Sequence, residues 1–137
     1  MTQRTLVILK PDAVRRGLVG NVLSRFEAKG LAIVAMELRT IEGEKADEHY
    51  AEHVERDFYP PLRAFVTSGP LVVAILEGDE AVEVVRAING ATDGRKAAPG
   101  TIRGDLSLSN RENLVHGSDS PESAAREIKI WFPELAD

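Results

Sequence analysis

The residues best suited to chemistry lie near the C-terminal end of this chain, in residues 113–121 (NLVHGSDSP). His116 precedes an expected helix start, where free backbone amides and the positive end of the helix dipole favour an incoming phosphate. A neutral imidazole is available near neutral pH as a nucleophile that holds a phosphoryl group and releases it again. On residue type and position alone, the simpler interpretation is that His116 only caps or packs at a turn.

The common phosphate and acyl-transfer motifs are missing from the sequence. It has no GxxxxGK[ST] loop, no GxGxxG turn and no GxSxG elbow, so a phosphate site must be built from scattered side chains. It also has no cysteine, which excludes disulfides, thiolate zinc sites and cysteine nucleophiles.

The charge balance constrains the partners. The chain has 17 basic and 22 acidic residues and a formal net charge of -5. Since no block of Lys and Arg suggests a surface that neutralises a nucleic-acid backbone, we expect no nucleic-acid partner. A protein of this charge that binds an anionic substrate must concentrate its few positive groups locally.

The other two histidines of the chain have metal-ligand spacing. His49 and His53 lie four residues apart on an expected helix. The zinc-protease pattern needs Glu directly after the first histidine, whereas Tyr50 stands there and the glutamate follows at Glu52. We therefore expect no protein-held metal at this pair.

The elements that position these residues follow from hydrophobic periodicity. Apolar runs predict strands at residues 5–9, 31–40, 71–76 and 113–116. A helical pattern follows residue 19 and ends at Gly30, a glycine stop. Residues 43–66 predict two short helices separated by Pro60 and Pro61.

The second half of the chain continues the alternation of strands and helices. Asp79 is expected to cap a helix that ends near Gly90. Residues 90–111 predict a long loop, and loops of this length are usually functional or disordered. Pro121 stands in the first turn of a last helix. The side chains expected on one face of that helix are Ala124, Ala125, Ile128 and Trp131.

This order of elements predicts an α+β fold of the ferredoxin-like, split βαβ class. Helices would cover one face of a four-stranded antiparallel sheet. A length of 137 residues suits one domain, so residues 1–137 are taken as a single domain. The longest apolar runs are too short to span a bilayer and the N-terminus lacks a signal-peptide core, so we expect a cytoplasmic protein without a membrane partner.

The sequence as a whole resembles the nucleoside diphosphate kinases. The family's active-site signature is matched by residues 113–119 (NLVHGSD). Further matches occur in the family's order at residues 10–12 (KPD), 15–20 (RRGLVG), 49–50 (HY), 68–70 (SGP) and 99–105 (PGTIRGD). The resemblance implies transfer of the γ-phosphate of ATP to nucleoside diphosphates, by a ping-pong cycle through phosphorylated His116.

The resemblance also implies residue roles. Glu127 would hydrogen-bond the His116 ring and select its tautomer, although on sequence alone it is an exposed helix residue pairing with Lys129 or Arg126. The other residues placed in the catalytic group are Lys10, Tyr50 and Ser118. The residues placed around the nucleotide are Lys10, Phe58, Leu62, Arg86, Thr92, Arg103 and Asn113, with Phe58 and Leu62 beside the base.

Each of these residues also has an ordinary structural interpretation. Lys10 is then a solvated strand end, Arg86 and Arg103 are surface charges, and Tyr50 belongs to the core. Two other functions stay open on the residues alone: a non-catalytic ferredoxin-like binding module, and a nucleic-acid-binding protein, which lacks the expected basic stripe. The resemblance further implies Mg²⁺ on the nucleotide phosphates and a homo-oligomer, hexamer or tetramer.

The chain departs from the family pattern at three positions. Asn110 stands beside the expected base site, where relatives more often have an apolar residue. Gly94 replaces a common proline in the loop, which predicts a less stable loop because glycine enlarges the unfolded ensemble. Leu106 replaces an aromatic residue. None of the three carries a predicted catalytic role.

Overall fold

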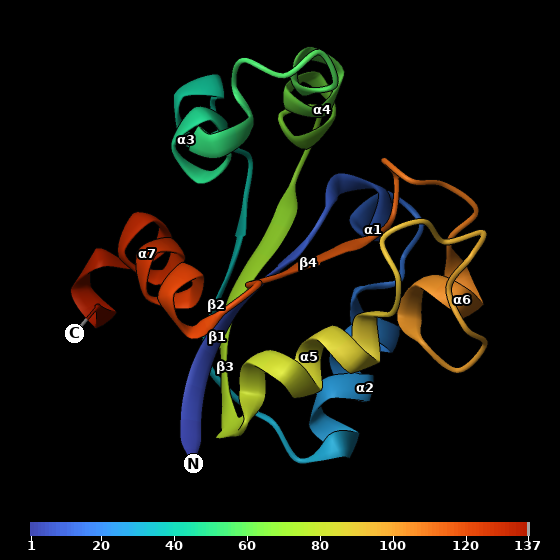
Figure 1. The fold of residues 1–137 in the computed structure, drawn as a ribbon, viewed down its shortest axis with the longest axis vertical. Helices are drawn as coiled ribbons and strands as arrows, with labels where there is room; N and C mark the ends of the chain where they lie inside the picture. The colour runs from blue at the N-terminus through green and yellow to red at the C-terminus, as the bar shows by residue number, and fades with distance from the viewer. Residues whose placement is uncertain (137) are drawn as a thin grey trace.

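The computed structural model describes residues 1–136, and Asp137, the last residue of the expected domain, lies outside them. The elements are β1 (Thr2–Leu9), α1 (Pro11–Arg15), α2 (Val19–Lys29), β2 (Ala32–Arg39), α3 (Gly43–His49), η1 (Ala51–His53), α4 (Tyr59–Val66), β3 (Leu71–Asp79), α5 (Ala81–Asn89), α6 (Ile102–Leu106), β4 (Val115–Gly117), α7 (Pro121–Trp131) and η2 (Pro133–Leu135) (Figure 1).

The four strands form one antiparallel sheet in the order β2-β3-β1-β4. This is the strand order of a split βαβ fold, so the predicted ferredoxin-like class is confirmed. The long strands β1 and β3 lie in the centre, paired from Thr2 with Asp79 to Leu9 with Val72. Their central position explains why both read as nearly continuous apolar runs.

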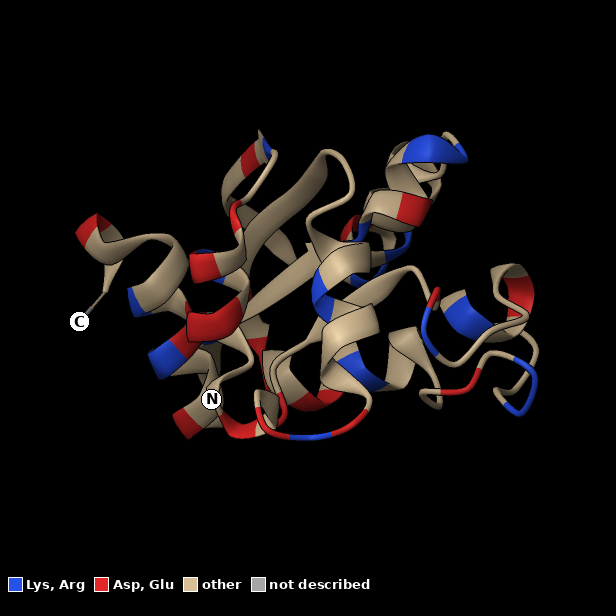
Figure 2. Cartoon of the chain, turned by 90° about the horizontal axis from the view of Figure 1, so that it is seen from above, with Lys and Arg blue, Asp and Glu red and all other residues tan. Residues whose placement is uncertain are grey.

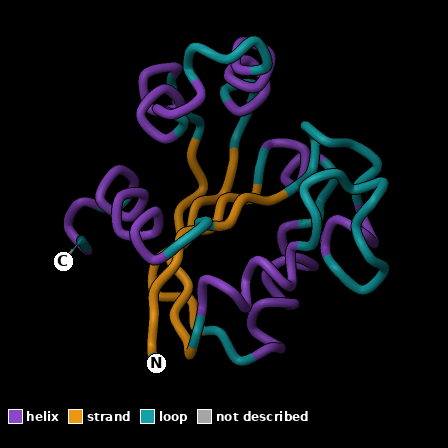
Figure 3. Tube along the Cα trace, viewed as in Figure 1, coloured by secondary structure: helices purple, strands orange, loops and turns teal. Residues whose placement is uncertain are grey.

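Helices cover both faces of the sheet, so the expectation of one covered face was wrong (Figure 3). Val7 and Leu9 belong to a core with residues of α1, α2 and α5. Leu6 and Ile8 face the opposite way, into a second core with residues of α3, α4 and α7. Successive side chains of a strand point to opposite faces, and since both sets here are apolar, both faces need a cover.

Two predicted helices begin and end where their signals lie. Helix α2 ends at Gly30, whose φ of 108° is the left-handed conformation that glycine adopts without strain. Helix α7 starts after Ser120, whose side chain accepts a hydrogen bond from the backbone amide of Ser123. On its expected apolar face Ala124, Ile128 and Trp131 are buried, whereas Ala125 is exposed.

Several boundaries differ from the predictions. Pro60 and Pro61 lie in the first turn of α4, where proline is tolerated, and the break between helices falls before them. Helix α5 is preceded by Glu80 at a φ of 52°, without a side-chain cap, while Asp79 instead pairs with the N-terminal amine. The last strand, β4, is shifted toward Gly117.

The predicted loop between α5 and β4 contains the short helix α6, which begins with a cap. The Thr101 hydroxyl accepts a hydrogen bond from the backbone amide of Gly104. Gly94 donates its backbone N–H to the carbonyl of Ser109, a bond that the family's proline could not make. A side chain at Gly94 would also overlap Ser107. The lower stability expected for the loop at Gly94 stays a prediction, and Leu106 packs against the core beneath.

None of the helices within residues 1–136 is long and apolar enough to cross a membrane. Charged residues are interspersed along the helices and loops, with acidic and basic positions side by side in several elements (Figure 2).

Replacing Gly104 by alanine is expected to destabilise the protein. A Cβ at this position would overlap the carbonyl of Ala98, so the α6 segment must shift at a cost of about 1–3 kcal/mol. Urea denaturation measures the effect. The matched control is Gly20→Ala in α2, where a Cβ meets no atom within 4 Å, and a loss of stability equal to that of Gly104→Ala would contradict this packing argument.

Candidate active site

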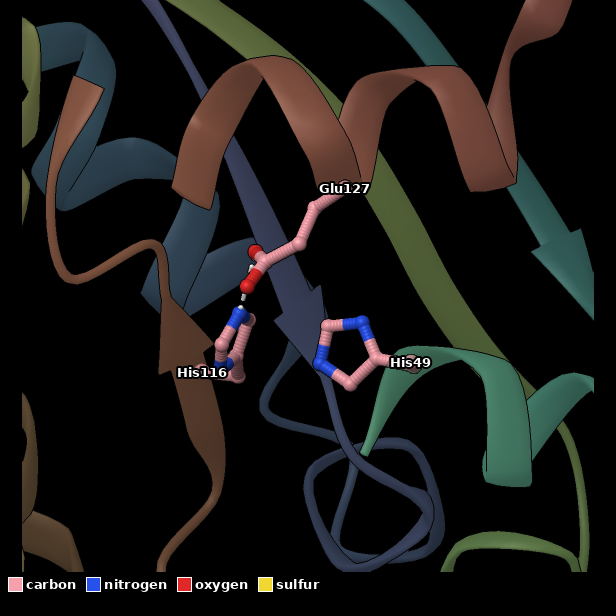
Figure 4. Close-up of side chains that lie close together, drawn as sticks. All are labelled: His49, His116 and Glu127. Carbon is pink, nitrogen blue, oxygen red and sulfur yellow. Dashed lines mark hydrogen bonds and ion pairs between the residues drawn. The ribbon is translucent and has the colours of Figure 1, made fainter. Parts of the chain in front are cut away.

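His116 and Glu127 form the centre of the site. His116 lies on β4 opposite Ile8 of β1, and its Nε2 is 2.8 Å from Oε1 of Glu127 on α7 (Figure 4). A carboxylate only accepts hydrogen bonds, so Nε2 carries the proton and Nδ1 keeps a free lone pair. The Glu127 side chain is only 7% exposed, so the interpretation of Glu127 as an exposed helix residue was wrong.

Ser118 supports the same carboxylate. Its hydroxyl donates to Oε1 of Glu127 at 2.8 Å, and its oxygen accepts from the backbone amide of Leu6 at 3.3 Å. Two donors therefore converge on one oxygen of a buried carboxylate. This compensates the cost of removing the charge from water and holds Glu127 in one orientation.

A polar cavity of about 460 Å³ lies in front of His116. The predicted residues that line it are Lys10, Tyr50, Arg86, Thr92, Arg103, Asn113 and His116. A second cavity of about 500 Å³ shares Lys10, Tyr50, Thr92 and Asn113 and adds Phe58, Leu62 and Asn110. The larger hollow between α2 and α5 is mostly apolar and lies away from these residues. The fold thus brings the predicted site residues together, with Glu127 and Ser118 behind the nucleophile.

Lys10 is a buried cation, not the solvated strand end of its ordinary interpretation. It is 7% exposed, and its Nζ donates to Oδ1 of Asn113 at 2.9 Å. Burial, together with the nearby positive charge of Arg103, lowers the pKa of Lys10 to about 8, while Asp12 opposes the shift. The ammonium therefore faces the cavity with little water to screen its charge.

Arg103 ties the α6 loop to β4. Its guanidinium donates to the carbonyls of Gly90, Asn113 and Val115. Burial lowers its pKa to about 10, with Arg86 as the second cause, so it stays charged at neutral pH. A guanidinium has five N–H donors, and these three bonds leave others to face the cavity.

Asn113 connects three segments of the chain. Its amide nitrogen donates to the carbonyls of Thr92 and Asn110, and its amide oxygen accepts from Lys10. Both N–H donors are therefore engaged within the protein. In this arrangement Asn113 holds the loop and the lysine in place.

Leu114, just before β4, has an unusual backbone conformation with a φ of 73°. A left-handed non-glycine residue costs free energy and persists only when neighbours hold it. Its amide donates to Oδ2 of Asp12 and its carbonyl accepts from the backbone amide of Lys10. Asp12 is buried, which raises its pKa. Asp12 had no predicted role, and its place in the KPD segment beside Lys10 was the available signal.

The cavity rim contains weaker interactions. Arg86 on α5 lies 4.0 Å from Asp119, and both side chains are more than half exposed. Tyr50 lines both cavities, and burial raises the pKa of its phenol, which keeps its proton available for donation. Phe58 is half-exposed at the mouth of the second cavity, with its ring 5.4 Å from that of His53.

His49, His116 and Glu127 form a cluster whose potential metal-ligand atoms lie within 4.8 Å of one another. Proton placement argues against a metal there. Trp131 donates its indole N–H to Nδ1 of His49 at 3.0 Å, which leaves the proton of a neutral His49 on Nε2. Nε2 of His116 also carries a proton, so this nitrogen has no lone pair for a metal ion while its hydrogen bond to Glu127 exists. His53, the expected partner of His49, lies outside the cluster.

Comparisons with known proteins identify the family. Residues 3–136 match the model of the nucleoside diphosphate kinase family. The chain is 77% identical to a nucleoside diphosphate kinase of a Nocardioides species over 98% of this chain and 100% of the relative. It is 60% identical to that of Mycobacteroides abscessus, with 98% and 100% covered.

Solved structures similar to this chain belong to the same family. The nucleoside diphosphate kinase of Halobacterium salinarum, solved in complex with CDP, is 45% identical, with a TM-score of 0.94 over 100% of this chain and 93% of that chain. That of Aquifex aeolicus is 44% identical, with a TM-score of 0.93 over 96% of each chain.

On this antiparallel ferredoxin-like sheet, a histidine hydrogen-bonded to a carboxylate lies at the same cavity as Lys10 and Arg103. This arrangement is that of a phosphotransferase. The chain belongs to the nucleoside diphosphate kinase family. It transfers the γ-phosphate of ATP to nucleoside diphosphates by a ping-pong mechanism through a phosphohistidine, and enzymes of this family use a divalent metal ion with the nucleotide.

The depressed pKa of Lys10 predicts a pH-dependent stability. Between about pH 8 and the ordinary value of 10.5, the unfolded chain binds a proton at Lys10 that the folded protein has lost. The free energy of unfolding should therefore rise over this interval, by on the order of 1–3 kcal/mol.

Urea denaturation on both sides of this interval measures the rise, which should disappear in Lys10→Met. Lys29→Met, which removes an exposed lysine at the end of α2, is the matched control and should retain it. An unchanged pH dependence in Lys10→Met would show that Lys10 has an ordinary pKa.

Proposed function

We propose that His116 is the residue that becomes phosphorylated, at Nδ1. The observation that carries the proposal is the hydrogen bond from Nε2 to Glu127, because it leaves Nδ1 as the nitrogen with a free lone pair. The cavity in front of the ring is lined by Lys10, Arg86 and Arg103, which supply the positive charge that phosphoryl transfer requires.

In the first half-reaction Nδ1 attacks the γ-phosphorus of ATP. The N–P bond forms while the bond from that phosphorus to the β,γ-bridging oxygen breaks, and ADP leaves with the electron pair. Nε2 keeps its proton, and Glu127 stabilises the positive charge that develops on the His116 ring. In the second half-reaction a terminal oxygen of a nucleoside diphosphate attacks the same phosphorus, and the N–P bond breaks.

The remaining catalytic roles follow from position. Lys10 and Arg103 neutralise charge on the transferred group, and the protonated phenol of Tyr50 donates to it from the cavity wall. Ser118 acts through Glu127, which it holds in place. Thr92 and Asn113 border both cavities, where phosphate meets sugar, with Arg86 at the rim. Because both N–H donors of Asn113 are used within the protein, Asn113 offers the nucleotide only its amide oxygen, as an acceptor for a sugar hydroxyl.

The second cavity takes the nucleotide base. Phe58 and Leu62 offer it an apolar wall, and a ring face stacks on any base, which suits an enzyme with many acceptors. Asn110 lines the same cavity and gives it a polar side. We therefore assign Phe58 and Leu62 to base binding, with Asn110 as an additional polar contact.

The divalent ion is Mg²⁺, carried on the nucleotide phosphates. Asp119 is the one carboxylate among the described residues that line the cavity of His116. A single carboxylate with several phosphate oxygens fits the preference of Mg²⁺, which keeps most of its waters. When bound, the ion neutralises phosphate charge, and Asp119 is the residue that would hold it to the protein.

The single domain spans residues 1–137, acts in the cytoplasm on ATP and nucleoside diphosphates, and has neither nucleic acid nor membrane as a partner. It forms a homo-oligomer, a hexamer or a tetramer. The outer strand β2 supports self-association, because Met36 and Leu38 on this sheet edge are 50% and 67% exposed. Exposed apolar side chains on an unpaired edge strand favour pairing with another chain.

Labelling tests the assignment of His116. Incubation with γ-labelled ATP should yield an acid-labile, alkali-stable phosphoprotein, and His116→Ala should lose both the label and phosphate exchange between nucleotides. Glu127→Gln should lower exchange by roughly 10- to 100-fold, because an amide orients the ring but carries no charge.

Glu122→Gln, an exposed glutamate in the first turn of α7, is the matched control and should exchange normally. Normal exchange by His116→Ala, or nucleotide binding by the unaltered protein without any exchange, would refute the assignment and favour a binding module.

Self-association has its own test. Leu38→Glu places a charge on the exposed edge of the sheet and should lower the molar mass measured by light scattering, since burying an unpaired charge in an interface is costly. Val54→Glu, which alters another exposed apolar residue away from the sheet, should leave the mass unchanged. An unaltered mass in Leu38→Glu would place the interface elsewhere.

A further inference from the structure

His49 has no role in the mechanism described above, although it lies beside the nucleophile. It is the last residue of α3 and is only 3% exposed. Its ring contacts the ring of His116, with centroids 4.6 Å apart and planes at 82°. In Figure 4 one of its nitrogens points toward the pair formed by His116 and Glu127.

The protonation of His49 is set by Trp131. An indole N–H can only donate, and it donates to Nδ1 of His49. Nδ1 therefore cannot hold a proton while this bond exists, and the ring is neutral with its proton on Nε2. Burial and the neighbouring His116, Arg126, Lys10 and His53 also lower the pKa of His49 well below its ordinary value.

The orientation of the ring is fixed as well. The ring of Tyr50 packs edge-on at 4.6 Å and that of Trp131 at 5.7 Å. Arg126 on α7 donates to the backbone carbonyls of Glu48 and His49, which ties the end of α3 to the helix that carries Glu127. His49 is thus a rigid, uncharged wall beside His116.

We propose that His49 is a positioning residue for phosphoryl transfer, which holds the plane of the His116 ring and places no charge beside it. The proposal rests on the proposed function of His116. The bond to Glu127 fixes Nε2, and a ring held only at its attachment to Cβ and at Nε2 can still rotate about the line between them. The edge-to-face contact with His49 removes that freedom, so Nδ1 keeps its direction toward the incoming phosphorus.

Neutrality matters for the same step. The His116 ring gains positive charge when Nδ1 forms its bond to phosphorus, and a second imidazolium at 4.6 Å would oppose this change. Trp131 prevents such a cation. The hydrogen bond from Trp131 therefore both fixes the orientation of the His49 ring and keeps that ring uncharged.

Single-turnover phosphorylation by γ-labelled ATP, with rapid quenching, tests the proposal. His49→Ala should slow the rate constant of phosphorylation by about 10- to 100-fold, while the nucleotide dissociation constant changes by less than about twofold, because the side chain acts on the orientation of His116. His49→Phe should recover most of the rate although it leaves the buried indole N–H unpaired and lowers stability. A structural role alone would make rate and stability fall together.

Tyr59→Phe is the matched control. It removes the hydrogen bond of 2.6 Å from Tyr59 on α4 to Asp47, which lies two residues before His49 on α3, and it should retain the wild-type rate. Nitrogen-15 NMR of labelled histidine gives a second readout. His49 should show a single tautomer with the proton on Nε2 at neutral pH, and Trp131→Phe should produce exchange between both tautomers.

Wild-type phosphorylation in both His49→Ala and His49→Phe, or a proton on Nδ1 of His49 in the unaltered protein, would overturn the proposal. Peptide mapping of the label separates this result from failure of the proposed function. If the phosphate is found on His116 and the rates are unchanged, only the role of His49 is lost. If the phosphate is found elsewhere, the assignment of His116 fails.

Discussion

The hydrogen bond between His116 and Glu127 is the interaction on which the rest of the site depends. It joins β4 to α7, and a buried carboxylate is tolerable only because two donors, from His116 and Ser118, converge on it. The bond forms because Ile128 and Trp131, next to Glu127 on α7, pack into the core on one face of the sheet. Packing of a helix thus decides which nitrogen of a histidine is nucleophilic.

The electrostatics of the site reconcile an acidic protein with an anionic substrate. Lys10 and Arg103 both line the cavity of His116, where burial lowers the pKa of each side chain. The charge of Arg103 adds to the shift of Lys10, and that of Arg86 adds to the shift of Arg103. The protein offsets the cost of burying these charges with carbonyl and amide oxygens from Gly90, Asn113 and Val115. The resulting positive potential acts on a phosphate with little screening, which a surface cluster of the same charge would not achieve.

The strained backbone at Leu114 is held by hydrogen bonds to residues that follow β1, near the other end of the chain. Leu114 holds a left-handed conformation because Asp12 binds its amide and Lys10 binds its carbonyl. The turn that results leads directly into Val115 and His116. The end of β1 therefore sets the path of β4, and the same segment supplies the buried cation, so position and charge are determined together.

The sequence by itself indicated the family, the type of most elements and the proposed nucleophile, His116. Local signals sufficed for α2, whose glycine stop lies at Gly30, and for α7, which starts at Pro121. What only the tertiary structure decided was burial and proton placement: that Glu127 is enclosed, that both amide N–H donors of Asn113 are used within the protein, and that the ring of His49 contacts that of His116. Burial and proton placement depend on contacts between residues far apart in the chain, such as Trp131 with His49. They also depend on the helices that pack on both faces of the sheet. Periodicity within one segment cannot specify which distant segment packs against it.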